Sequence, residues 1–130
     1  MSTAQRISVG FGIFYLAIGV LGFIPGITAA STQPGQGLLL GVFAVNALHN
    51  VVHLAVGAVL AWAGMSTAAA VTVNKLLAPV FLILVVTSFV APVAEGVAIN
   101  LPDSLLHLLS AALTGYAGYM AEHRPMRAAA

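Results

Sequence analysis

Apolar residues dominate four long stretches of the sequence, at about residues 7–24, 38–63, 74–91 and 102–121. Short segments with glycine or proline, such as Pro25-Gly26, Gly64 and Pro92, interrupt the stretches. Each stretch approaches the ~20 residues that a helix needs to cross about 30 Å of hydrocarbon. None shows the alternation of polar and apolar residues that is typical of membrane-barrel strands. The pattern therefore predicts an all-α protein with four transmembrane helices.

The composition agrees with this prediction. Of the 130 residues, 61% are hydrophobic and only 5% are charged, whereas a soluble domain has about 25% charged residues. So few charges cannot cover a soluble surface, and we expect the lipid bilayer to be the main partner. The length fits a single transmembrane domain over residues 1–130. The chain has no cysteine, which excludes disulfides and thiolate metal sites, and no basic stretch indicates a nucleic-acid partner.

The charged residues predict how the helices are oriented. If all four stretches cross the bilayer, all the basic residues fall on one side, namely Arg6, Lys75, Arg124 and Arg127. Glu95 and Asp103 then lie on the opposite side. Basic residues are enriched in cytoplasmic loops, so we expect both termini to be cytoplasmic. Short loops make successive helices antiparallel, which predicts an up-down-up-down four-helix bundle.

Polar side chains interrupt two of the apolar stretches. The second stretch carries Asn46, His49, Asn50 and His53. Offsets of three and four residues place Asn46 and both histidines on one helical face, with Asn50 beside it. In the fourth stretch, residues 103 and 107 are an aspartate and a histidine on one face. Polar groups are costly in hydrocarbon, so we expect these side chains to point into the bundle and meet one another.

The depth of each histidine suggests which of them pair. A helix that starts near residue 38 places His49 about 16 Å into the membrane, and His107 lies roughly 6–9 Å into the fourth helix, at ~1.5 Å per residue. By depth His107 matches Asn46 best, it meets His49 if the helices tilt, and we expect His53 to lie deeper with a different partner. Of the histidines, His49 and His107 are closest in depth and form the preferred pair. Asp103 either accepts the ring proton of His107 or caps its helix together with Asn100.

These motifs resemble those of a known family. Residues 46–53 read NALHNVVH, Gly57 follows them, and residues 103–107 read DSLLH. The combination resembles the uncharacterised family of small four-helix bacterial membrane proteins called domain of unknown function 4383, which is common in actinobacteria. The resemblance covers most of the chain. It implies a four-helix membrane fold in the bacterial cytoplasmic membrane, and it implies no reaction, cofactor or mechanism.

Three functional interpretations of the polar cluster remain open. In the first, the histidines and asparagines hold helices together, typically at ~0.6 kcal/mol per hydrogen bond and at most about 2 kcal/mol. The protein is then an accessory or structural component of a larger complex of membrane subunits. In the second, the cluster relays protons or small solutes, although no carboxylate lies at mid-membrane depth. No arrangement of a nucleophile and a base indicates hydrolytic catalysis, so we expect no enzyme of that class.

The third interpretation is a cofactor site. Neutral imidazole is a ligand of haem iron, copper and zinc. A haem b between the second and fourth helices would use His49 and His107, with His53, Asn46, Asn50 and Asp103 in supporting positions. A metal site that uses all three histidines is possible as well, but the expected depth of His53 disfavours it.

Overall fold

The computed structural model describes residues 1–33, 35–90 and 96–121. These residues form four helices, which are α1 (Thr3–Leu21), α2 (Ala47–Ala63), α3 (Thr67–Val90) and α4 (Leu101–Tyr119). Three short strands lie between α1 and α2, namely β1 (Thr28–Ala30), β2 (Gly37–Leu39) and β3 (Phe43–Val45). They pair as one antiparallel sheet in the order β1-β2-β3. The mainly helical fold is thus confirmed, and the small sheet is an addition that the hydrophobic pattern did not predict.

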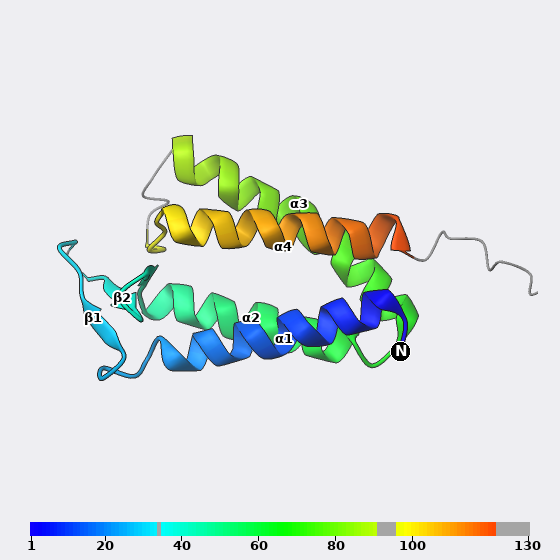
Figure 1. The fold of residues 1–130 in the computed structure, drawn as a ribbon, viewed down its shortest axis with the longest axis horizontal. Coiled ribbons are helices and arrows are strands. Elements are labelled where there is room, and N and C mark those ends of the chain that lie inside the picture. The colour runs from blue at the N-terminus through cyan, green and yellow to red at the C-terminus, as the bar shows by residue number, and fades with distance from the viewer. Residues whose placement is uncertain (34, 91–95, 122–130) are drawn as a thin grey trace, which may run out of the picture.

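The four helices pack as two antiparallel pairs. Helix α1 lies mainly against α2, and α3 lies mainly against α4 (Figure 1). Glycine allows the backbones to approach closely in each pair. A Cβ atom at Gly57 of α2 would lie 2.6 Å from the backbone nitrogen of Leu16, and one at Gly118 of α4 would lie 2.6 Å from that of Lys75. Such small-residue contacts are typical of helix packing in membranes.

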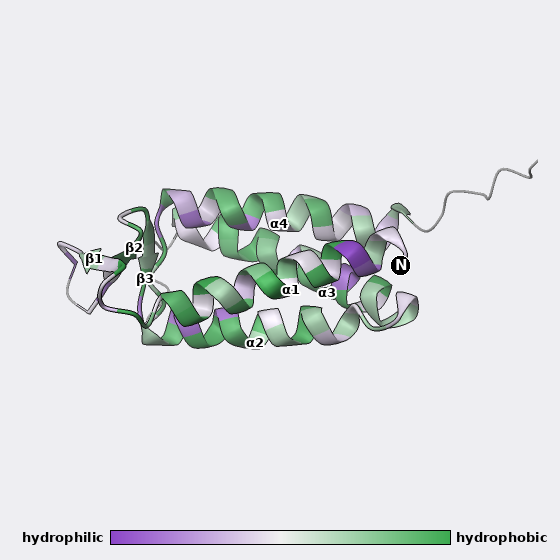
Figure 2. Ribbon diagram, turned by 60° about the horizontal axis from the view of Figure 1, so that its bottom comes forward, coloured by the Kyte–Doolittle hydropathy of each residue, from purple (hydrophilic) through white to green (hydrophobic). Residues whose placement is uncertain are grey.

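Apolar side chains cover much of the outer surface of the helices. Figure 2 shows hydrophobic residues along most of the helical surface, with hydrophilic residues concentrated near helix ends. Large side chains such as Ile13, Phe89 and Leu105 are 62%, 70% and 59% exposed. Among the described residues, α1 and α3 are long and apolar enough to cross a membrane, and α2 is apolar but has 17 residues.

Helix α2 starts later than the hydrophobic pattern predicts. We expected a helix over 38–63, but residues 37–39 and 43–45 form strands and the helix begins at Ala47. The turn between the strands has Leu40 and Gly41 at φ angles of 53° and 72°, a conformation that a right-handed helix does not contain. Leu39 and Val45 are each 2% exposed. This segment is apolar because it packs on the end of the bundle.

The other helix boundaries differ less. Helix α1 begins at Thr3, after a capping box formed by Ser2 and Gln5. Helix α3 begins at Thr67 instead of near residue 74, and it continues through Pro79. The side-chain oxygen of Asn100 caps α4 at the amide of Asp103. Glu95, Arg124 and Arg127, which contribute to the predicted orientation, and the expected end of the third helix at 91 lie outside the described residues.

Candidate functional site

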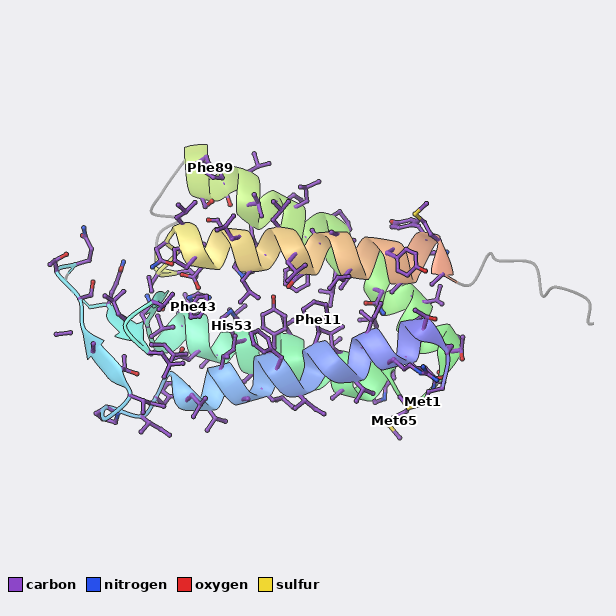
Figure 3. All side chains as sticks on the ribbon, in the orientation of Figure 1. Met1, Phe11, Phe43, His53, Met65 and Phe89 are labelled. Carbon is purple, nitrogen blue, oxygen red and sulfur yellow. The ribbon has the colours of Figure 1, made fainter. Side chains whose placement is uncertain are left out.

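Three buried histidines converge at the end of the bundle that carries the strands. His49 and His53 come from α2, and His107 comes from α4. Each offers one ring nitrogen, and these nitrogens all lie within 4.8 Å of one another. The side chains are 2%, 4% and 3% exposed, respectively. Figure 3 shows His53 toward the end of the bundle where Phe43 lies.

The position of His53 corrects the prediction from depth. The ring centroids of His49 and His53 both lie 6.3 Å from that of His107, so the expectation that His53 needs a different partner is wrong. The reason is the late start of α2. His53 follows the first residue of α2 by six positions, and His107 follows the first residue of α4 by six positions. Both helices begin at the same end of the bundle (Figure 1), so the two histidines lie at similar depth.

Hydrogen bonds determine which ring nitrogens carry hydrogen in the neutral rings. His49 Nδ1 lies 3.0 Å from the carbonyl oxygen of Ala44, and a carbonyl can only accept, so Nδ1–H donates. His49 Nε2 therefore has a lone pair. It accepts from His53 Nε2–H at 2.9 Å, which leaves His53 Nδ1 without a hydrogen. That nitrogen and His107 Nδ1 are buried without a hydrogen-bond partner among the described residues.

The Asp103 carboxylate holds the strand that contacts His49. Its Oδ2 accepts from the backbone N–H of Ala44 and of Asn100, each at 3.1 Å. Asp103 and Asn100 also form the capping box of α4, so the capping role is the one that the contacts show. The side chain is 1% exposed. Ala44 thus donates to Asp103 through its nitrogen and accepts from His49 through its oxygen.

The two asparagines of the predicted cluster have separate surroundings. Asn46 caps α2 by accepting from the backbone N–H of His49 at 2.8 Å, and its Nδ2 donates to the carbonyl oxygen of Gly96 at 2.6 Å. Asn50 lies against α1, where a Cβ atom at Gly22 would overlap its side chain. Asn46 therefore supports the start of the helix that carries His49, whereas Asn50 belongs to the α1–α2 contact and not to the histidine cluster.

A small cavity adjoins the histidines. Its volume is about 170 Å³, and its lining comprises Tyr15, His49, Val52, His53, Val56, Phe81, Leu84, Val97, Ile99 and His107. The ring of Phe81 stacks on His107 at 5.9 Å between centroids, and the ring of Tyr15 lies 5.1 Å from that of His53. The Tyr15 hydroxyl is engaged elsewhere, in a 2.7 Å hydrogen bond with Ser110 Oγ. The histidines are therefore the polar groups that this cavity presents to a bound ion.

Comparison with known families agrees with the resemblance of the motifs. The family model described as Domain of unknown function (DUF4383) matches residues 5–120. The chain belongs to this family. No curated protein matches the chain, and no solved structure matches it. The family description assigns no reaction to its members. The chemistry available to this protein therefore depends on the residues of the histidine cluster.

The three histidines have the chemical properties of metal ligands. Neutral imidazole is a ligand of zinc, copper, iron and nickel. A ligating histidine usually donates its other ring N–H to a carbonyl or carboxylate, which fixes the tautomer, and His49 already makes that bond with Ala44. Sequence reasoning missed Ala44, Tyr15 and Phe81. Ala44 acts through its backbone and the two rings come from other helices, so no local sequence signal connects them to the histidines.

Proposed function

We propose that this DUF4383 protein is a four-span protein of the bacterial cytoplasmic membrane that binds one divalent transition-metal ion through His49, His53 and His107. The observation that carries the proposal is the convergence of three buried ring nitrogens within 4.8 Å. Two of the rings also have a buried nitrogen without a partner among the described residues. Buried polar atoms are normally satisfied, so an unpartnered ring nitrogen such as His107 Nδ1 is available as a ligand of an ion.

The packing of the helices supports four spans. Helices α2 and α4 have 17 and 19 residues, which gives them lengths of roughly 25 and 28 Å, close to the hydrocarbon thickness of about 30 Å. Each packs along a helix that is long and apolar enough to span, α2 on α1 and α4 on α3. Arg6 lies near the start of α1, at the end of the helices opposite the strands (Figure 1). Lys75 lies in the first half of α3, which starts at that same end. The positive-inside rule then places the termini in the cytoplasm and the histidines toward the outside.

The geometry suits a metal ion better than a haem. Tetrahedral zinc with Zn–N distances of ~2.0–2.1 Å requires ligand nitrogens roughly 3.4 Å apart. The Nε2 atoms of His49 and His53 are 2.9 Å apart, and the three ring nitrogens lie within 4.8 Å, so ring movements of about an ångström complete the site. Pockets for cofactor-sized ligands have volumes of about 300–1,000 Å³, whereas this cavity has about 170 Å³. Phe81 stacks on His107 at 5.9 Å between centroids and lines the cavity, which leaves less room for a flat macrocycle beside His107.

The contacts support a metal site more than a purely structural role. The hydrogen bond between His49 and His53 lies within one helix, so it does not join two helices. His107 Nδ1, on the opposite helix, has no partner in the described part of the chain. Asp103, the carboxylate that shares a helix with His107, has its Oδ2 engaged by two backbone amides, so this oxygen serves the helix cap rather than a proton relay through the rings.

Metal analysis of the detergent-purified protein tests the proposal. After incubation with Zn²⁺ and removal of free metal, we expect one ion per chain. We expect His107→Ala to lose this ion, and His123→Ala, which changes the fourth histidine of the chain, to retain it. Zinc binding that is absent, or that is unchanged in His107→Ala, would contradict the proposal and favour an accessory role in a larger membrane complex.

A further inference from the structure

The histidine cluster supplies three ligands, and the surrounding residues that the structure describes supply no fourth. Among the described residues, the group of His, Cys, Asp and Glu side chains close enough to share an ion consists of His49, His53 and His107. Asp103 is outside this group and its Oδ2 is occupied by the amides of Ala44 and Asn100. Structural zinc sites have four protein ligands, whereas sites with three protein ligands keep a position for water or substrate.

The cavity provides room at that position. Apart from the histidines and Tyr15, its walls are apolar, formed by Val52, Val56, Phe81, Leu84, Val97 and Ile99. A water molecule has a share of about 30 Å³ in the liquid, so a volume of about 170 Å³ holds a ligand of a few atoms beside the ion. An extended organic substrate does not fit.

Charge narrows the class of ligand further. Three neutral imidazoles leave a divalent ion with its full charge of two, and none of the described residues that line the cavity carries a charge. An unpaired charge in apolar surroundings is costly, so a single negative charge on the ligand is favoured because it halves the net charge of the site. A strongly hydrated dianion such as sulfate is disfavoured because it would have to lose its water to enter the apolar cavity.

We infer that the fourth coordination position is open and takes a small exogenous monoanion of the hydroxide or azide type. This inference rests on the proposed metal site and extends it, because an open site can exchange ligands whereas a closed structural site cannot. A bound ion would lower the pKa of a coordinated water, so that hydroxide, with its proton released to bulk water, would occupy this position when no other anion is present.

Azide binding to the Co²⁺-loaded protein tests the open position, because Co²⁺ replaces zinc and has visible d–d bands. In the detergent-purified full chain, we expect one Co²⁺ per chain and a saturable change of the d–d spectrum with azide but not with sulfate. Val56→Phe fills the cavity without changing a ligand. We expect it to retain Co²⁺ and to weaken azide binding by roughly tenfold or more, since the added ring takes the space of the ligand.

The matched control is Val59→Phe, on the same helix but 45% exposed, which we expect to bind azide like the wild type. A protein that binds Co²⁺ in a 1:1 ratio with a spectrum that azide and cyanide do not alter would overturn the open position and leave the metal site intact. Equal azide binding by Val56→Phe and the wild type would overturn the assignment to this cavity. A protein that does not bind Co²⁺ would overturn both proposals.

Discussion

Asp103 and His49 are connected through the backbone of one residue, Ala44. The N–H of Ala44 donates to Asp103 Oδ2 at 3.1 Å, and its carbonyl oxygen accepts from His49 Nδ1 at 3.0 Å. A carboxylate near the start of α4 therefore determines the position of the strand that orients a ring on α2. This connection explains how a three-residue strand contributes to a site formed by helices.

Removal of the Asp103 carboxylate tests this connection. We expect Asp103→Ala to weaken metal binding by about 10- to 100-fold, the usual effect of losing a group that orients a ligand. The loss of the buried acceptor and of the helix cap also lowers the free energy of unfolding by about 1–3 kcal/mol. Co²⁺ titration and thermal unfolding in detergent measure the two effects. Asp103→Asn retains one acceptor oxygen, so we expect its metal affinity and its stability to lie between those of the wild type and Asp103→Ala. Unchanged metal affinity in Asp103→Ala would show that Ala44 does not orient His49.

A three-histidine site and a two-histidine site differ in the effect that His53→Ala should have on metal binding. We expect His53→Ala to weaken Co²⁺ binding as severely as His107→Ala, because each removes one of three ligands at similar depth. The measurement is the dissociation constant of Co²⁺ for each variant. If His53→Ala binds like the wild type and only the His49→Ala and His107→Ala variants lose the ion, the pair expected from the sequence is the correct ligand set.

Close packing of α1 on α2 predicts opposite effects for two glycines. A Cβ atom at Gly57 would lie 2.6 Å from the backbone nitrogen of Leu16, whereas one at Gly10 meets nothing within 4 Å. We expect Gly57→Ala to lower the free energy of unfolding by about 1–3 kcal/mol because it forces the helices apart. Gly10→Ala should raise it by up to about 1 kcal/mol, since alanine has the higher helix propensity. Unfolding in detergent measures both, and equal effects would contradict the described packing.

The four-span topology can be tested by labelling, because the chain has no cysteine of its own. Thr32 lies in the exposed segment between β1 and β2, and Met65, which is 80% exposed, lies between α2 and α3. We expect a membrane-impermeant maleimide to label Thr32→Cys in intact spheroplasts. Met65→Cys should be labelled only after the membrane is opened. Labelling of both residues from the outside would exclude the proposed topology.

The helices of this protein could be predicted from the sequence, whereas the strands between α1 and α2 could not. Four apolar stretches correspond to four helices, and the offsets of three and four residues placed His49 and His53 on one face. Residues 37–45 are as apolar as the helices, and Leu39, Ala44 and Val45 among them are buried at the end of the bundle. Hydrophobicity alone does not distinguish a buried hairpin from a helix, although the glycines at 37 and 41 are a signal of turns.

That one error also determined which part of the site was predicted incorrectly. A helix that began at residue 38 would place His53 too deep to meet His107, whereas the true start at Ala47 brings the two together. The predicted proximity of His49 and His107 was estimated from the same start, and the two ring centroids are 6.3 Å apart in the structure. The contributions of Tyr15, Phe81 and Ala44 depend on the three-dimensional packing, and the spacing of residues in one helix contains no information about them.

X-ray absorption spectroscopy of the Zn²⁺-loaded protein in detergent measures directly whether three imidazoles share one metal ion. We expect one tightly bound ion with three imidazole nitrogens at about 2.0–2.1 Å and one further light atom. We expect His53→Ala to retain no zinc after free metal is removed. A wild-type spectrum of zinc surrounded only by oxygen atoms, or a wild-type protein that retains no zinc after free metal is removed, would contradict the three-histidine metal site.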